Sequence, residues 1–169
     1  ESPHDPLEAE KSWFFFDKEY VCLGTGISCG NKLPVVTTVN QCLLKDNVTA
    51  MVDNKRLTIP LGNHELQNTR WIFHNGVGYL FPDSTSVNLS NQSQTGSWYE
   101  ISKQSHTPKE KITREVFKLW LQHGKHPQDE SYEYIVVPGT TKEKISSGFN
   151  GRNLVILSNT PEVQAVKHT

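Results

Sequence analysis

The chain has 169 residues, of which 35% are hydrophobic and 21% charged, and its formal net charge is −1 at pH 7. This length allows one domain that buries roughly 70% of the surface of its unfolded chain. The near-neutral charge argues against a nucleic-acid-binding protein, which normally shows a basic excess. No apolar run reaches the ~18 residues of a membrane-spanning helix. We therefore expect no nucleic-acid partner and no membrane segment.

The N-terminal residues have no basic segment followed by an apolar core, so they do not read as a signal peptide. We expect residues 1–10 to be a linker and residues 11–169 to form a single β-sandwich domain. The cysteines Cys22, Cys29 and Cys42 are odd in number and match no zinc spacing, so we expect reduced thiols or simple packing residues.

Short apolar or alternating runs, separated by Gly, Pro, Asn, Asp and Ser, follow each other along the whole chain. A spacing of roughly 8–12 residues between turn signals is typical of all-β sandwiches. The predicted strands are 12–16, 20–26, 35–41, 51–52, 56–60, 70–74, 77–81, 86–90, 96–100, 113–123, 131–137, 154–158 and 163–167.

The first strand carries the aromatic run Trp13-Phe14-Phe15-Phe16. Successive side chains of a strand point to opposite faces, so Trp13 and Phe15 share one face while Phe14 and Phe16 share the other. Because soluble proteins rarely expose large apolar patches, we predict a central strand buried on both faces. The alternative is that some of these rings line a sugar-stacking groove. The residues 17–19 are predicted to turn the chain back beside this strand.

Asn75-Gly76, between two apolar runs, predicts a two-residue hairpin. His74 is then a hairpin-end residue, and Tyr79 is expected in the core with its hydroxyl hydrogen-bonded. The segment 108–121 fits both helical and strand spacing. We assign it as a strand, because an alternating run at 131–137 offers a partner for a long hairpin.

Several blocks of the sequence are informative beyond their periodicity. They are Lys11-Ser12-Trp13-Phe14-Phe15-Phe16-Asp17, Val21-Cys22-Leu23-Gly24-Thr25-Gly26-Ile27, Thr37-Thr38-Val39-Asn40-Gln41, His74-Asn75-Gly76-Val77-Gly78-Tyr79-Leu80-Phe81-Pro82, Thr95-Gly96-Ser97-Trp98, His123-Gly124, Tyr132-Glu133-Tyr134 with Pro138, and Asn159-Thr160 with Val163-Gln164-Ala165-Val166. In this order, the blocks together resemble polysaccharide lyase family eight, which holds the bacterial chondroitin, hyaluronan and xanthan lyases. They extend from about residue 10 to the end of the chain.

The resemblance implies an all-β, galactose-mutarotase-like fold, a large antiparallel super-sandwich that packs on a separate α/α-toroid catalytic domain. Family members cleave uronic-acid-containing polysaccharides by β-elimination. Their catalytic Asn, His, Tyr and Arg lie in the toroid and an assisting Glu lies upstream of the aromatic run, so no residue here matches a catalytic position. The resemblance also implies a secreted or periplasmic protein that forms one wall of the substrate cleft.

A basic stretch is the best candidate for contact with an acidic polysaccharide. Its proposed substrate-binding residues are Lys103, Lys111, Arg114, Lys118 and Trp120, the last as a stacking platform. Glu110 and Glu115 interrupt the stretch, which favours the alternative of a solvated face. Trp98 is expected to pack in the core.

Metal chemistry has weak support in the sequence. His123 and His126, with Asp129 or Glu130, suggest ligands, but a turn interrupted by Pro127 favours ordinary surface residues. Calcium bound near Asp17 and Glu19 is an alternative that lacks the spacing of a dedicated loop. We expect no metal and no other cofactor.

The leading hypothesis is therefore a non-catalytic domain of a polysaccharide lyase. The alternatives are a free-standing carbohydrate-binding module and, as the third choice, a lyase in its own right, for which the sequence shows no grouped base, acid and carboxylate neutraliser.

Overall fold

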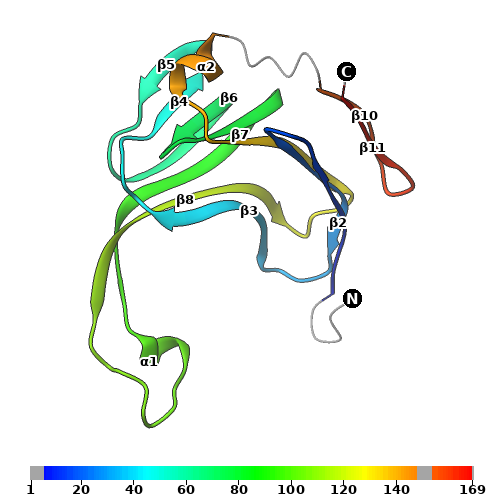
Figure 1. The fold of residues 1–169 in the computed structure, drawn as a ribbon. Coiled ribbons are helices and arrows are strands. Elements are labelled where there is room, and N and C mark those ends of the chain that lie inside the picture. Colours follow the sequence, from blue (N-terminus) through cyan, green and yellow to red (C-terminus); the bar gives the residue numbers. More distant parts are fainter. Residues whose placement is uncertain (1–5, 148–153, 169) are drawn as a thin grey trace.

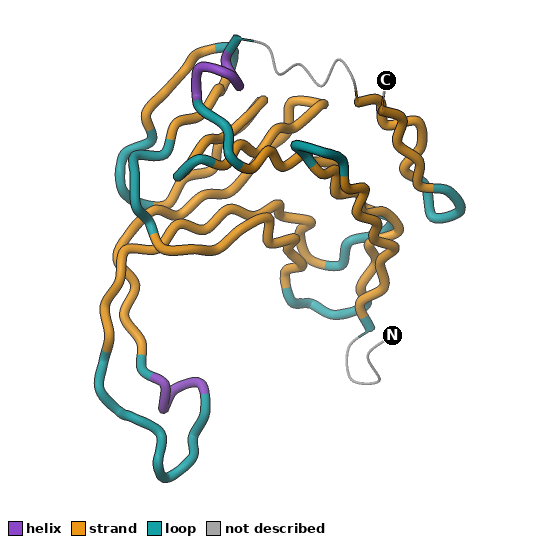
Figure 2. The backbone as a smooth tube through the Cα atoms, in the orientation of Figure 1, coloured by secondary structure: helices purple, strands orange, loops and turns teal. Residues whose placement is uncertain are grey.

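The computed structural model describes residues 6–147 and 154–168, and strands dominate these residues (Figure 2). The elements are, in chain order, β1 (Leu7–Phe15), β2 (Tyr20–Cys29), β3 (Pro34–Leu43), β4 (Thr49–Val52), β5 (Lys55–Thr58), β6 (Asn63–His74), β7 (Val77–Gly96), α1 (Trp98–Ile101), β8 (Ile112–Lys125), β9 (Glu130–Pro138), α2 (Lys142–Ser146), β10 (Leu154–Asn159) and β11 (Gln164–His168) (Figure 1).

The strands pair antiparallel in the order β1-β2-β9-β7-β6-β4-β5, with β8 joining β7 to β3 and with β10–β11 as a separate hairpin. The strand β7 belongs to two layers. Its start, Val77–Leu80, pairs with β9, whereas Asn88–Gly96 pairs with β8. This arrangement confirms the predicted all-β antiparallel sandwich.

The main core lies between the layer that contains β2 and β9 and the layer formed by β3 and β8. Alternation along β8 explains its inner face, because Phe117, Leu119 and Leu121 are buried while Lys118 and Trp120, between them, are half-buried. The buried core residues are Cys22, Ile27, Val48, Ala50, Val52, Ile59, Ile72, Tyr79, Phe81, Val87, Leu89, Phe117, Leu119, Leu121, Tyr132, Tyr134 and Val136.

A second apolar cluster covers the opposite face of β2 and β9. Val21 and Ile135, on these two strands, belong to it together with Ile145 of α2 and Leu154 of β10. The strands β2 and β9 are therefore buried on both faces, which is the environment that we predicted for the aromatic run.

The aromatic run itself lies elsewhere, because β1 is the edge strand of the sheet. Phe14 and Phe16 are half-buried and pack against the second cluster. Trp13 and Phe15 are 54% and 74% exposed. The prediction of a central strand was wrong for this segment: the side chains alternate as expected, but no layer of the described residues covers the Trp13 and Phe15 face.

Two further boundaries differ from the expectation. The strand β1 begins at Leu7, so residues 7–10 of the expected linker belong to the sheet. The strand predicted at 96–100 is replaced by α1, where the N-cap Ser97 and Glu100 form a capping box. This turn leaves Trp98 59% exposed instead of in the core.

The hairpin at Asn75-Gly76 is confirmed, with both residues at positive φ (46° and 77°) as a type I′ turn requires. The strand assignment within 108–121 is also confirmed from Ile112 onward, since β8 begins there. Its predicted partner was wrong. β8 pairs with β3 and β7, whereas β9 lies between β2 and β7, so the two do not form a hairpin.

Candidate functional site

The outer face of β8 carries three of the five predicted substrate-binding residues. Lys118 and Trp120 alternate with the buried residues of the strand and therefore share its outer face, and Arg114, an even number of residues earlier, lies on the same side although its own neighbours are exposed. Neighbouring strands supply polar residues beside Trp120, which is in register with Thr38 of β3 and Asn88 of β7. The result is a polar sheet face with one half-buried indole, an arrangement that suits contact with a sugar ring.

The other two predicted residues lie in the connection between β7 and β8, residues 97–111, a projecting arm that extends from the rest of the molecule with α1 near its end (Figures 1 and 2). Lys103 and Lys111 are exposed in the loop that follows α1. The register places Gly96 opposite Ile112 and Asn88 opposite Trp120, so the start of β8 lies about 27 Å from Trp120 along the strand. The five residues therefore do not form one cluster.

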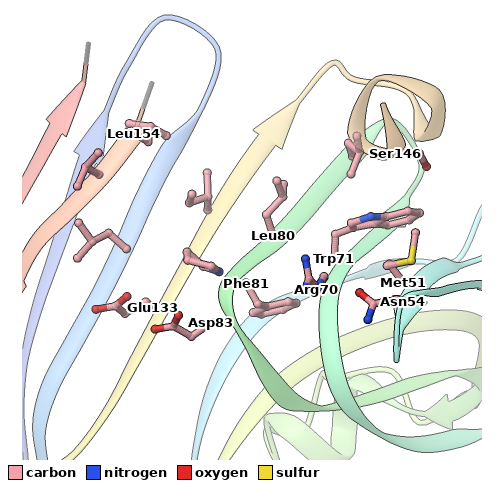
Figure 3. Close-up of a pocket in the computed structure, with 15 residues that line it drawn as sticks. Met51, Asn54, Arg70, Trp71, Leu80, Phe81, Asp83, Glu133, Ser146 and Leu154 are labelled. Atoms are coloured by element: carbon pink, nitrogen blue, oxygen red, sulfur yellow. The ribbon is translucent and has the colours of Figure 1, made fainter. Parts of the chain in front are cut away.

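A cavity of about 640 Å³ lies against the face of β6, β7 and β9 that α2 and β10 border (Figure 3). Its lining residues are Met51, Asn54, Arg70, Trp71, Leu80, Phe81, Pro82, Asp83, Glu133, Ile135, Ile145, Ser146, Leu154, Val155 and Ile156. Most of the apolar lining belongs to the second cluster, whereas Phe81 belongs to the main core, and the polar part holds two carboxylates and a guanidinium.

The sequence analysis missed the three charged residues of this cavity, Arg70, Asp83 and Glu133. Burial raises the pKa of Glu133, and the neighbouring charge of Asp83 adds to this effect, whereas a hydrogen bond with Asn159 opposes it. No local signal could reveal these three residues, because they come from different strands that only the pairing of the sheet brings together.

A buried polar network lies in the main core. The side-chain amide of Asn40 donates to the hydroxyl of Tyr79, which confirms the expected partner of this phenol. Next to it, Cys42 lies 3.7 Å (Sγ to Nδ1) from His74, whose ring stacks on Phe117 with centroids 4.4 Å apart. His74 is only 1% exposed, so it is a core residue as well as the end of the hairpin.

The tyrosines of the core keep their protons. Burial raises the pKa of both Tyr79 and Tyr132 to about 12, and it raises the pKa of Tyr134 as well. A catalytic base works best with a pKa near the working pH. These phenols are therefore poorly suited to abstract a proton, and the network is structural.

The histidines considered as metal ligands have other surroundings. Thr37 Oγ1 and His123 Nε2 lie 2.8 Å apart, and burial lowers the pKa of His123. Glu19, the proposed calcium neighbour of Asp17, contacts His168 at 3.2 Å (Oε1 to Nε2). Within the described ranges, no three His, Cys, Asp or Glu residues gather as a metal site would require.

The antiparallel pairing of the strands, with β2 and β9 buried on both faces, defines the domain as a β-sandwich. The chain belongs to polysaccharide lyase family 8, since the model of that family's super-sandwich domain matches residues 1–148.

Known lyases align over nearly the whole chain. Chondroitinase-AC of Pedobacter heparinus is 40% identical over 98% of this chain, and a hyaluronate lyase of Thermasporomyces composti is 38% identical over 95%. Among solved structures, a chondroitinase AC lyase studied with oligosaccharides superposes with a TM-score of 0.87 at 38% identity, covering 98% of this chain and 24% of that one. Paenibacillus xanthan lyase superposes with a TM-score of 0.90 at 30% identity, covering 100% and 17%.

The relatives are much longer than this chain, which spans 23% of the chondroitinase and 21% of the hyaluronate lyase. In these enzymes the segment that matches is a minor part of the polypeptide. The described residues hold no helix with the length and hydropathy of a membrane span.

Proposed function

We propose that this chain is the non-catalytic β-sandwich portion of a polysaccharide lyase that cleaves uronic-acid-containing polymers, of the chondroitin or hyaluronan class, by β-elimination. The observation that carries the proposal is the match to the super-sandwich domain combined with the small share of the relatives that it spans. In this proposal the chain packs on an α/α-toroid catalytic domain of the same parent polypeptide and forms one wall of the substrate cleft.

The chemistry of the described residues supports a non-catalytic role. β-Elimination at a uronic acid needs a base for the C5 proton, an acid for the leaving oxygen and a group that neutralises the carboxylate. The core phenols have raised pKa values and His74 is buried away from solvent. The reactive groups are therefore proposed to lie in the remainder of the parent enzyme, and the domain needs no metal or other cofactor.

The proposed contacts with the polymer lie on the outer face of β8. Lys118 and Arg114 would attract carboxylate or sulfate groups, and Trp120 would stack on a sugar ring. Lys103 and Lys111 would act as a second, separate attraction point on the projecting arm. Because such polymers lie outside the cell, the proposal includes a secreted or periplasmic location.

The test compares the purified 169-residue chain with the full-length parent polypeptide. Both are incubated with chondroitin sulfate, hyaluronan and xanthan, and the ultraviolet band of the unsaturated uronate is followed. We expect product from the parent polypeptide and none from the chain. Product from the chain would overturn the proposal, and its loss on Glu133→Gln would then assign the reaction to the cavity of Figure 3.

A free-standing carbohydrate-binding module is the second candidate, and the observation that favours it is the half-buried Trp120 among polar residues on an open sheet face. Calorimetry of the isolated chain with hyaluronan and chondroitin sulfate separates the two. Tight binding by the chain, together with a parent polypeptide that turns over no polymer, would favour the binding module.

A further inference from the structure

The inner face of the sheet is apolar across its whole width but loses its cover at β1. One cross-strand row begins at Phe15 of β1 and continues through Tyr20 of β2, Val136 of β9 and Tyr79 of β7 to Ile72 of β6. The last three members are at most 3% exposed, whereas Phe15 is 74% exposed. The row is thus a continuous strip of core residues, and its outermost member, Phe15, lies in solvent.

A neighbouring row repeats the pattern. Trp13 is in register with Cys22, which is in register with Tyr134. Cys22 and Tyr134 are 1% and 7% exposed, and Trp13 is 54% exposed. Since two successive rows lose their cover at the same strand, the uncovered region is a property of β1 rather than of one side chain.

The backbone of β1 is also available for pairing. β1 ends the strand order and pairs with β2 alone among the described strands. An exposed edge strand with apolar side chains is a template for another strand, and natural proteins normally cover or blunt such edges. Between Lys11 and Phe15 the edge has neither a proline nor a bulge, since the register shift of β1 lies earlier, between Glu8 and Glu10.

We propose that a further strand of the parent lyase, from outside these 169 residues, pairs with the outer edge of β1 between Lys11 and Phe15 and places apolar side chains beside Trp13 and Phe15 on the same face. This inference rests on the proposed function, because it needs a larger parent polypeptide. Two observations identify the occupant. The relatives carry more than three quarters of their length outside the matching segment, and the uncovered face continues a core that is already formed within this family's super-sandwich domain.

The test measures amide hydrogen exchange of residues 11–15 in the isolated chain and in the full-length parent polypeptide. In the isolated chain, the amides on the free edge should exchange quickly while those bonded to β2 are protected. In the parent polypeptide, both sets should be protected, with exchange of the edge amides slowed at least about 100-fold. Equal exchange in both proteins would overturn the proposal.

A double variant, Trp13→Ser with Phe15→Ser, provides an independent readout. Because both side chains are exposed in the described structure, the isolated chain should keep its melting temperature within a few degrees, while the parent polypeptide should melt at a clearly lower temperature. Leu61→Ser is the matched control, since Leu61 is 69% exposed and lies in the turn before β6, away from β1. Equal effects of the double variant and the control on the parent polypeptide would contradict the proposal.

Other occupants give different results. Light scattering could show that the isolated chain is a dimer and that the double variant is a monomer. This result would show that β1 contacts a second copy of the chain. Weaker binding of hyaluronan oligosaccharides by the double variant of the isolated chain would assign the face of β1 to sugar stacking. Either result overturns the proposal. Failure of the proposed function has a separate signature, a parent polypeptide that protects β1 but cleaves no uronic-acid polymer.

Discussion

Gly24 of β2 lies directly beneath the ring of Tyr132 of β9, and a Cβ at this position would overlap three atoms of that ring. The glycine is thus required by a close approach between a backbone and an aromatic side chain. Tyr132 in turn stacks on Tyr134 with ring centroids 5.7 Å apart, so the approach supports an aromatic row in the main core.

We predict that Gly24→Ala destabilises the chain by about 1–3 kcal/mol, because overpacking forces a core ring away from its position. The measurement is urea unfolding followed by circular dichroism. Gly30→Ala is the control, since a Cβ there meets nothing within 4 Å, and it should change stability by less than about 0.5 kcal/mol. Equal stability of the two variants would contradict the packing of Tyr132 on Gly24.

Asn91 of β7 is buried and joins the backbone of the segment before β6. Its Oδ1 accepts from Gly62 N at 3.0 Å, and its Nδ2 donates to Ile59 O at 3.3 Å. Asn91→Ala would leave the amide of the half-buried Gly62 and the carbonyl of the buried Ile59 without these partners, and we expect a loss of about 1–3 kcal/mol. Chemical unfolding checks this value.

The neighbour Gln92 offers the control for that measurement. Its Nε2 donates to Asn63 Oδ1 at 3.2 Å, but this pair is exposed and water can replace the bond. Gln92→Ala should therefore cost well under 1 kcal/mol. A loss as large as that of Asn91→Ala would show that the strand position rather than the buried amide matters.

Stability should fall in mild acid because burial lowers the pKa of His74 below the usual value for histidine, about 6.5. Below that value the unfolded chain binds a proton that the folded chain excludes, so the unfolded state gains from each decrease in pH. This loss of unfolding free energy is absent above pH 7 and grows as the pH falls from about 6.5 towards the pKa of His74 in the folded chain, by at most about 1.4 kcal/mol per pH unit. His123 shifts in the same direction.

The pH dependence is measured as the melting temperature between pH 7.5 and 5.5. His74→Gln should be less stable at pH 7.5, since it loses the stack on Phe117, but its melting temperature should depend less on pH. His106→Gln, at an exposed position, should keep the slope of the unmodified chain. An unchanged slope in His74→Gln would exclude His74 as a source of the acid sensitivity.

Binding of an acidic polymer should depend on the outer face of β8. We predict that Lys118→Ala combined with Trp120→Ala weakens the affinity of the parent polypeptide for hyaluronan by about tenfold or more, equivalent to about 1.4 kcal/mol. Lys103→Ala should have a smaller effect, because Lys103 lies on the projecting arm. Titration at low salt measures both, and the opposite order would move the contact to the arm.

The sequence predicted those features that depend on neighbours along the chain. Alternation predicted the strand in 108–121. Asn75-Gly76 predicted the hairpin between β6 and β7, because two residues at positive φ determine that turn. The partner of a strand depends instead on distant segments. For that reason the pairing of β8 with β3 and the edge position of β1 were not predicted.

The candidate sites show the same division. The alternating face of Arg114, Lys118 and Trp120 can be found along a single strand, whereas Asp83 and Glu133 meet only through the pairing of β7 with β9. The expected core position of Trp98, which follows Thr95-Gly96-Ser97, is wrong, because the side chain is exposed. The capping box of Ser97 and Glu100 instead begins a helical turn, which turns the indole outward.

The strand β7 takes part in both layers, since its first residues pair with β9 and its later residues pair with β8. A movement that separated the two layers would have to break the hydrogen bonds in the middle of β7. The domain should therefore move as one rigid body. In the proposed parent lyase, any opening or closing that admits a polymer would then take place between this domain and the domains next to it.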